Sequence, residues 1–148
     1  MKSQEKKGKT KIAAYELLSR YASGERNFKG INLSGKNLSS AILKGIDLSD
    51  ADLSNAILIN AVLDGANLSG ANLSNANLSD AWLNSADLKG ANLSNAKLIY
   101  AELTHSDLTN ANLTNANLEG ADLHATKLIN AKLSGAKITL ADINVVIR

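Results

Sequence analysis

The sequence contains no cysteine and no proline, and it is poor in aromatic residues. Without cysteine, disulfide bonds and thiolate metal sites are excluded. The absence of proline suits a fold in which every backbone amide is available for hydrogen bonding. With one Phe, one Trp and three Tyr among 148 residues, a core must be built from aliphatic side chains, chiefly Leu and Ala. The length suits a single domain.

Long hydrophobic runs are absent as well. No apolar stretch approaches the roughly 20 residues that a membrane-spanning helix needs. The basic segment Met1–Lys11 is not followed by the apolar stretch of a secretory signal. We therefore expect a cytoplasmic protein with no membrane span.

The net charge of +2 is unevenly distributed along the chain. Residues 1–26 hold seven Lys or Arg against three Glu, giving +4, whereas the remainder holds nine basic and eleven acidic residues, giving −2. Neither part has the dense basic footprint of a dedicated nucleic-acid-binding protein. We expect no specific nucleic-acid partner.

A five-residue repeat dominates the sequence. From Phe28 to Ile143, every fifth residue is Leu, Ile or Phe, which makes 24 positions, and Ala stands two residues earlier in 18 of them. A period of five fits neither an α-helix nor a conventional strand, so the chain must turn through about a right angle at each repeat. Four repeats close a square coil of twenty residues with Leu and Ala inside, and 24 repeats predict about six coils, a rod of about 29 Å at the usual strand spacing.

The turn residues fit the same geometry. Two residues after each Leu, Gly or Asn is common, as at Gly65, Gly70, Asn75 and Asn95. These residues adopt the positive φ that the second central position of a type II turn requires.

Runs such as Ala66-Asn67-Leu68-Ser69-Gly70 resemble the A-(D/N)-L-X-X signature of the pentapeptide-repeat family. The resemblance covers residues 26–145, and the lead-in at residues 20–28 is similar to that of cyanobacterial members. It implies an all-β solenoid, a right-handed quadrilateral β-helix, in which the handedness comes from the resemblance alone. Many members of the family have no known role, so the resemblance does not define a function.

The repeat divides the chain into four parts: a basic flexible tail at 1–9, a capping helix and lead-in at 10–25, the β-helix at 26–145 and a C-terminal tail at 146–148. We expect a helix over residues 10–22, with Thr10 as its N-cap and Gly24 as its stop signal. Its apolar stripe, which holds Ala14, Leu17, Leu18, Tyr21 and Ala22, would cover the first coil. Attachment of this helix to a membrane surface is the alternative.

At the C-terminus, the apolar segment Asp142–Arg148 either folds across the last coil or leaves that end to a second copy. Some members of the family form dimers through this end, so the resemblance implies a possible homodimer.

Residues twenty apart should stack in columns on the outside of the rod. One column places apolar residues before the Leu, and the neighbouring face adds four more; the set is Ile42, Val62, Trp82, Ile57, Ile59, Ile99 and Tyr100. An exposed apolar patch of this kind is typical of a protein-interaction surface. Two alternatives remain: β-branched and aromatic residues favour stacked strands in any case, and another segment could cover the patch.

We expect no metal, no cofactor and no enzymatic activity. His105, His124, Glu102 and Asp122 should lie near one another, but the acidic residues belong to a register that is usually Asp or Asn, so a solvated surface is the preferred interpretation. No nucleophile with a base, phosphate-binding loop or buried carboxylate pair is evident.

The preferred functional hypothesis is a non-catalytic scaffold that presents side-chain columns to an unknown protein partner. The alternative is a DNA mimic that binds topoisomerase, since some family members protect that enzyme from quinolones in this way. Asp47, Asp87 and Asp107 share one column, but Asn67 interrupts it and Lys127 ends it, whereas mimicry of a duplex needs dense negative charge. Weak nucleic-acid binding through the basic tail and a purely structural role are further alternatives.

Overall fold

The computed structural model describes residues 9–139 and 141. The predicted basic tail, apart from Lys9, and the predicted C-terminal tail at 146–148 lie outside these residues, as does most of the segment Asp142–Arg148. The domain boundaries at both ends and the number of coils therefore stay predictions.

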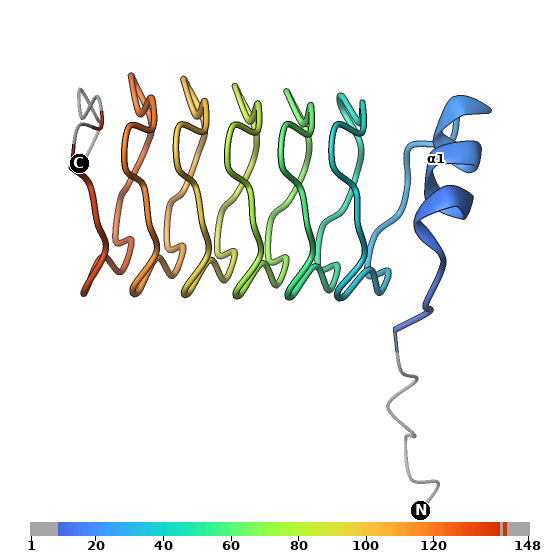
Figure 1. Ribbon diagram of the computed structural model, residues 1–148, viewed down its shortest axis with the longest axis horizontal. Coiled ribbons are helices and arrows are strands. Elements are labelled where there is room, and N and C mark those ends of the chain that lie inside the picture. Colours follow the sequence, from blue (N-terminus) through green and yellow to red (C-terminus); the bar gives the residue numbers. More distant parts are fainter. Residues whose placement is uncertain (1–8, 140, 142–148) are drawn as a thin grey trace, which may run out of the picture.

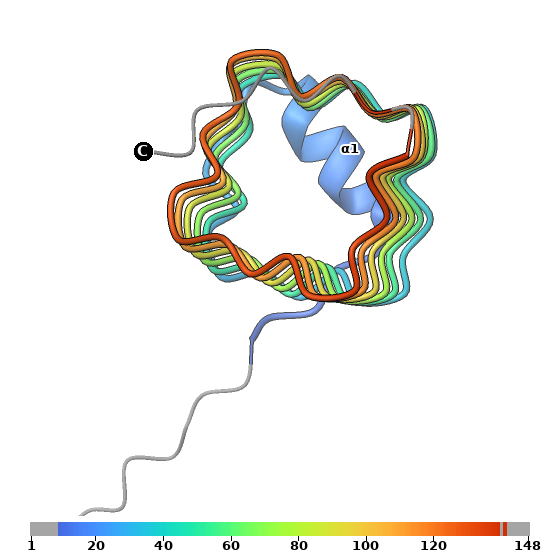
Figure 2. The same ribbon diagram turned by 90° about the vertical axis from the view of Figure 1, so that its left-hand side faces the viewer.

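The repeats wind into a stack of four-sided coils (Figures 1 and 2). Parallel β-bridges join residues twenty apart, as in Asn27 to Asp47 and Asp47 to Asn67, so each coil lies directly on the previous one. In the described part of the chain the ladder is made of single-residue bridges, with one on each side of a coil, and no longer strand forms. The chain bends after each bridge because the next turn begins within two residues.

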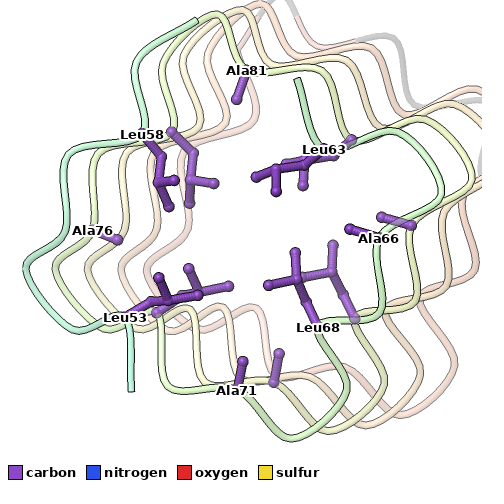
Figure 3. Packing of buried hydrophobic residues seen from close by; sticks show 14 of the residues in the cluster. Leu53, Leu58, Leu63, Ala66, Leu68, Ala71, Ala76 and Ala81 are labelled. Carbon is purple, nitrogen blue, oxygen red and sulfur yellow. The ribbon is translucent and has the colours of Figure 1, made fainter. Parts of the chain in front are cut away.

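The interior is a column of alternating large and small apolar side chains (Figure 3). Leu53, Leu58, Leu63 and Leu68 point inward and are fully buried, and so are the alanines that precede them in the repeat, of which Ala66 is one. Burying a Leu side chain contributes about 1.5–3 kcal/mol to stability. Because a buried Leu recurs on the sides of successive coils, this contribution stabilises the stack along its length.

The predicted turns are present. The Ala56 amide donates to the Leu53 carbonyl at 3.0 Å, and the residue between them at the corner, Asn55, has a φ of 58°. The same positive φ is imposed on residues whose type does not favour it, including Tyr100 at 56° and Ala125 at 54°. The stacking register thus overrides local preference at these corners.

Helix α1 spans Ala14–Ala22 and lies across the first coil. Our expectation of a start after Thr10 was wrong: the N-cap is Ala13, which makes no side-chain cap bond. Residues 10–12 are extended instead, because Lys11 forms a parallel bridge with Asn32.

The end of α1 and its buried side chains agree in part with the prediction. Gly24 stops the helix with a φ of 99°, and Arg20 lies 3.7 Å from Glu16. Leu17 is fully buried against the core, but Leu18 and Ala22 are exposed, so the apolar stripe is narrower than expected. Nothing in the described helix is long and apolar enough to cross a membrane.

At the opposite end the core becomes exposed. Leu123 is buried, whereas Leu133 and Ile138 are 41% and 46% exposed. The described residues therefore leave apolar side chains open at this end of the rod.

Candidate interaction surface

The first predicted column of apolar residues forms as expected. Parallel bridges join Ile42 to Val62 and Val62 to Trp82. Ile42 is 64% exposed and Trp82 is 47% exposed, while Val62 between them is half-buried. The three side chains therefore form one continuous strip on a single side of the rod.

The other four predicted residues lie on the adjoining side. Ile57 and Tyr100 are exposed, whereas Ile59 and Ile99 are half-buried. Ile59 and Ile99 belong to one column but are two coils apart, with a serine between them. This side is thus less continuous than the first. We call the whole set the apolar surface: Ile42, Val62, Trp82, Ile57, Ile59, Ile99 and Tyr100.

A recurrent side-chain hydrogen bond shows what these apolar residues replace. Where Asn or Asp stands before the Leu, its Oδ1 accepts a bond from the amide two residues later, as Asp52 does from Ser54 at 3.0 Å. All fourteen Asn and Asp residues at this register between 27 and 122 make this bond. Ile42, Ile57, Val62 and Trp82 have no side-chain oxygen with which to make it. Each therefore forgoes a bond worth about 0.5–1.5 kcal/mol.

Beside Trp82, a different set of polar contacts compensates in part. The Asn84 amide donates to Asp64 Oδ1 at 3.0 Å, and the Thr104 amide donates to Asn84 Oδ1 at 3.1 Å. Asn84 Nδ2 also donates to Glu102 Oε2 at 3.0 Å. These bonds run between coils instead of within one repeat. No comparable acceptor among the described residues serves the amides of Lys44 and Ile59, which follow Ile42 and Ile57.

The acidic column on another side is interleaved with lysines. Lys89 Nζ lies 3.2 Å from Asp87, and Lys127 Nζ lies 3.9 Å from Asp107. The Asp87 carboxylate raises the pKa of Lys89 above its usual value. Burial raises the pKa of Asp107, but bonds from Thr109 and the charges of Lys127 and Lys89 outweigh it and bring the pKa below its usual value. The negative charge on this side is therefore largely neutralised.

The histidines and carboxylates do not form a metal-binding cluster. The rings of His105 and His124 are 6.0 Å apart and nearly perpendicular. Asp122 accepts a bond from the His124 amide, and Glu102 is engaged by Asn84. Between residues 9 and 139, and at 141, no three His, Asp or Glu residues are placed to hold one ion.

Two features were not anticipated from the sequence. An open cavity of about 220 Å³ lies between α1 and the first coil and is lined by Thr10, Arg20 and residues 27–31. The Arg20 guanidinium forms a salt bridge with the Glu25 carboxylate, and Arg20 Cζ lies 4.9 Å from the centre of the Phe28 ring. The second feature is the ring of Tyr100, which lies over Gly120. The cavity depends on contacts of α1 that the column pattern does not describe, and the Tyr100 contact depends on the rotamer of its side chain.

Comparison with known proteins adds a family and a fold. The family model described as pentapeptide repeats matches residues 27–58, 46–84, 76–115 and 106–144. A pentapeptide repeat protein from the thylakoid lumen of Arabidopsis thaliana is 31% identical over 70% of this chain and 69% of its own, with a TM-score of 0.62. A pentapeptide repeat protein of the cyanobacterium Nostoc is 29% identical over 94% of this chain and 98% of its own, with a TM-score of 0.53.

A third similar structure is QnrB1, a plasmid-mediated fluoroquinolone resistance protein. It is 23% identical over 82% of this chain and 67% of its own, with a TM-score of 0.68, which is a likeness of fold alone. No curated protein matches the sequence.

Proposed function

Because the chain belongs to the pentapeptide-repeat family, whose fold is a right-handed quadrilateral β-helix, we propose that it is a non-catalytic interaction module. In this proposal a rigid rod of about six coils presents the apolar surface to a protein partner. The partner contacts the strip of Ile42, Val62 and Trp82 and the neighbouring side with Tyr100. The protein acts as a scaffold in the cytoplasm.

One observation carries the proposal. Every Asn or Asp at the register before Leu, from 27 to 122, makes the same stabilising bond, and the apolar surface replaces that residue at four positions on two adjoining sides. Exposed apolar side chains gain little from folding, so the fold alone does not account for them. Clustered exposure of Trp, Tyr and Ile is typical of surfaces that bind proteins.

The alternative of a topoisomerase-binding DNA mimic has weaker support. Fluoroquinolone resistance belongs to QnrB1, which this chain resembles in fold. Mimicry of DNA needs a continuous negative potential, whereas Lys29, Lys89 and Lys127 each pair with an aspartate on the acidic side here. We therefore favour an apolar protein interface.

A homodimer through the C-terminal end is a separate proposal. It is supported by the exposure of Leu133 and Ile138 at that end of the described rod. Sedimentation equilibrium of the intact chain tests it: Leu133→Lys/Ile138→Lys should shift a dimer to monomer, and a wild-type monomer at micromolar concentration would overturn it.

Capture experiments test the interaction role. Wild type, Trp82→Asp/Ile99→Asp and a control, Asn72→Asp/Asn92→Asp, would be immobilised and exposed to lysate of the source organism. The control adds the same charge on a different side of the rod. We expect wild type and control to retain a common protein that the first variant loses, with circular dichroism showing all three folded. Equal retention by all three proteins would contradict the proposal.

A further inference from the structure

Among the described residues, no backbone runs alongside the first coil at Asn37 and Ile42, so its edge is open on these sides. On the side of Asn32 that edge is occupied, because residues 10–12 run alongside it: the Asn32 amide donates to the Thr10 carbonyl at 2.8 Å, and Lys11 bridges Asn32. The chain then leaves the coil path to form α1. Residues 10–12 therefore form one side of a preceding coil, and the chain continues into α1 instead of forming the next side.

The next two sides of the first coil, around Asn37 and Ile42, lack such a neighbour. In the second coil the corresponding amides are bonded, with Ile57 donating to the Lys36 carbonyl at 2.9 Å and Val62 to the Ala41 carbonyl at 2.8 Å. The amides of Asn37 and Ile42 find no acceptor among residues 9–139 and 141. Exposure agrees with this difference, since Asn37 is exposed whereas Asn77 in the same column is half-buried.

Helix α1 covers the core but not this edge. Leu17 is fully buried and closes the interior, and the Tyr21 hydroxyl donates to the Lys44 carbonyl at 2.7 Å. Ile42, which precedes that point in the chain, stays 64% exposed. Helix α1 therefore covers the apolar end of the coil and bonds to one carbonyl, and no group among the described residues pairs with the backbone at Asn37 and Ile42.

We propose that the open edge on the Ile42 side of the first coil binds an extended segment of a partner protein by β-strand addition. Unpaired N–H and C=O groups on a sheet edge are a template for another strand. Residues 10–12 show that the coil accepts one, since they pair with Asn32 in the parallel sense of the whole ladder. This site goes beyond the apolar surface and shares only Ile42 with it.

Side chains beside the edge define the chemistry of the segment. Ile42 offers an apolar contact, and Lys36 and Lys44 flank it without an ion-pair partner among the described residues. An extended segment that alternates apolar and acidic residues would pair with both features. A basic or helical segment would not.

A labelled ten-residue peptide of alternating valine and glutamate is a suitable probe for the full chain. We expect it to bind, as measured by fluorescence anisotropy, and to slow hydrogen exchange of the Ile42 amide by about tenfold or more. The Val62 amide, already bonded to Ala41, is the internal control and should not change. The same peptide with every amide nitrogen methylated should bind about tenfold more weakly or worse, because it cannot donate ladder bonds. Absence of binding at millimolar peptide, or binding that leaves the Ile42 amide exchanging as before, would overturn the proposal.

Two variants separate this site from the apolar surface. Ile42→Asp should abolish peptide binding and still fold, because Asp47 and Asp52 occupy the same register and bond to the following turn. Trp82→Asp/Ile99→Asp should bind the peptide as wild type does. If Trp82→Asp/Ile99→Asp loses partner capture but keeps the peptide while Ile42→Asp loses the peptide, both proposals stand. If Trp82→Asp/Ile99→Asp keeps both the partner and the peptide, the proposed function fails and the edge site stands. If Ile42→Asp keeps the peptide, the edge site fails.

Discussion

The ring of Tyr100 occupies the space in which residue 120 would carry a side chain. A Cβ added to Gly120 would lie 2.3 Å from Tyr100 Cε1 and 2.4 Å from Cδ1. The two residues are one coil apart in the same corner column, and the Tyr100 corner is 58% exposed. Glycine at 120 therefore leaves the space that the Tyr100 ring occupies.

Gly120→Ala should displace this ring. Both Gly120 and Gly90 have positive φ values, 67° and 65°, but a Cβ at Gly90 would meet nothing within 4 Å. Backbone strain should therefore cost each variant about 1 kcal/mol, and Gly120→Ala should also change the NMR signals of the Tyr100 ring. Unchanged Tyr100 signals in Gly120→Ala would contradict the packing described here.

The buried hydroxyl of Ser106 should lower stability. Its side chain is fully buried, and its Oγ has no hydrogen-bond partner among the residues that the structure describes. Thr126, one coil further on, donates to the Leu103 carbonyl at 2.8 Å. Removing an unsatisfied polar group recovers its desolvation cost, so Ser106→Ala should stabilise the protein by about 1 kcal/mol. Thr126→Ala should destabilise it, because a satisfied bond and a methyl group are lost. Urea unfolding checks both, and destabilisation by Ser106→Ala would show that the hydroxyl is satisfied.

Two adjacent leucines of α1 should differ sharply in importance. Leu17 is fully buried on the face of α1 that covers the first coil, and Leu18 is 37% exposed. Leu17→Ala should cost about 2–4 kcal/mol because it leaves a cavity at the end of the core. Leu18→Ala should cost less than about 1 kcal/mol. Equal losses in thermal unfolding would mean that the helix does not close the coil through Leu17.

Acid should weaken the turn at Asp47. The Ser49 hydroxyl, donating at 2.6 Å, and then the Ser49 amide hold the pKa of Asp47 below its usual value, while burial opposes them and Lys29 adds a smaller effect. A carboxyl whose pKa is lower in the folded state contributes stability above its unfolded pKa of about 3.9, and loses it as pH falls through the folded value.

Ser49→Ala should therefore raise the pKa of Asp47, as followed by carboxyl NMR, and make stability less sensitive to acid. Ser74→Ala is the matched control, because Ser74 makes the same hydroxyl bond to Asn72, which does not titrate. A Ser49→Ala variant with an unchanged Asp47 titration would rule out the hydroxyl as the main cause.

Much of the fold follows from the five-residue period, and the exceptions have physical causes. The inward Leu and Ala and the columns of residues twenty apart, including Ile42 above Val62, depend only on the period, so the sequence predicts them. The start of α1 cannot be predicted from the period, because Lys11 pairs with Asn32 at a spacing of 21 residues instead of 20. Local propensity cannot reveal that a tertiary ladder holds residues 10–12 extended.

The sequence predicts where the residues of the apolar surface lie, but it does not predict the hydrogen bonds that surround them. Reading the columns identifies Trp82 as an exposed side chain. The bonds from Asn84 to Asp64 and Glu102 that surround it join different coils, and they depend on side-chain rotamers that the pattern does not encode. Similarly, Tyr100 was expected to be exposed, but its position over Gly120 follows only from the three-dimensional corner.

Substitution of Ile57 measures whether the apolar surface is retained at a cost to the stability of the fold. Asn77, one coil away in the same column, bonds to the Ser79 amide at 3.1 Å, whereas the Ile59 amide after Ile57 has no acceptor among the described residues. We predict that Ile57→Asn raises the free energy of unfolding in urea by about 0.5–1 kcal/mol and that Asn77→Ile lowers it by a similar amount. If β-propensity alone explains the apolar residues, both signs reverse, and that result would contradict an apolar surface kept for a partner.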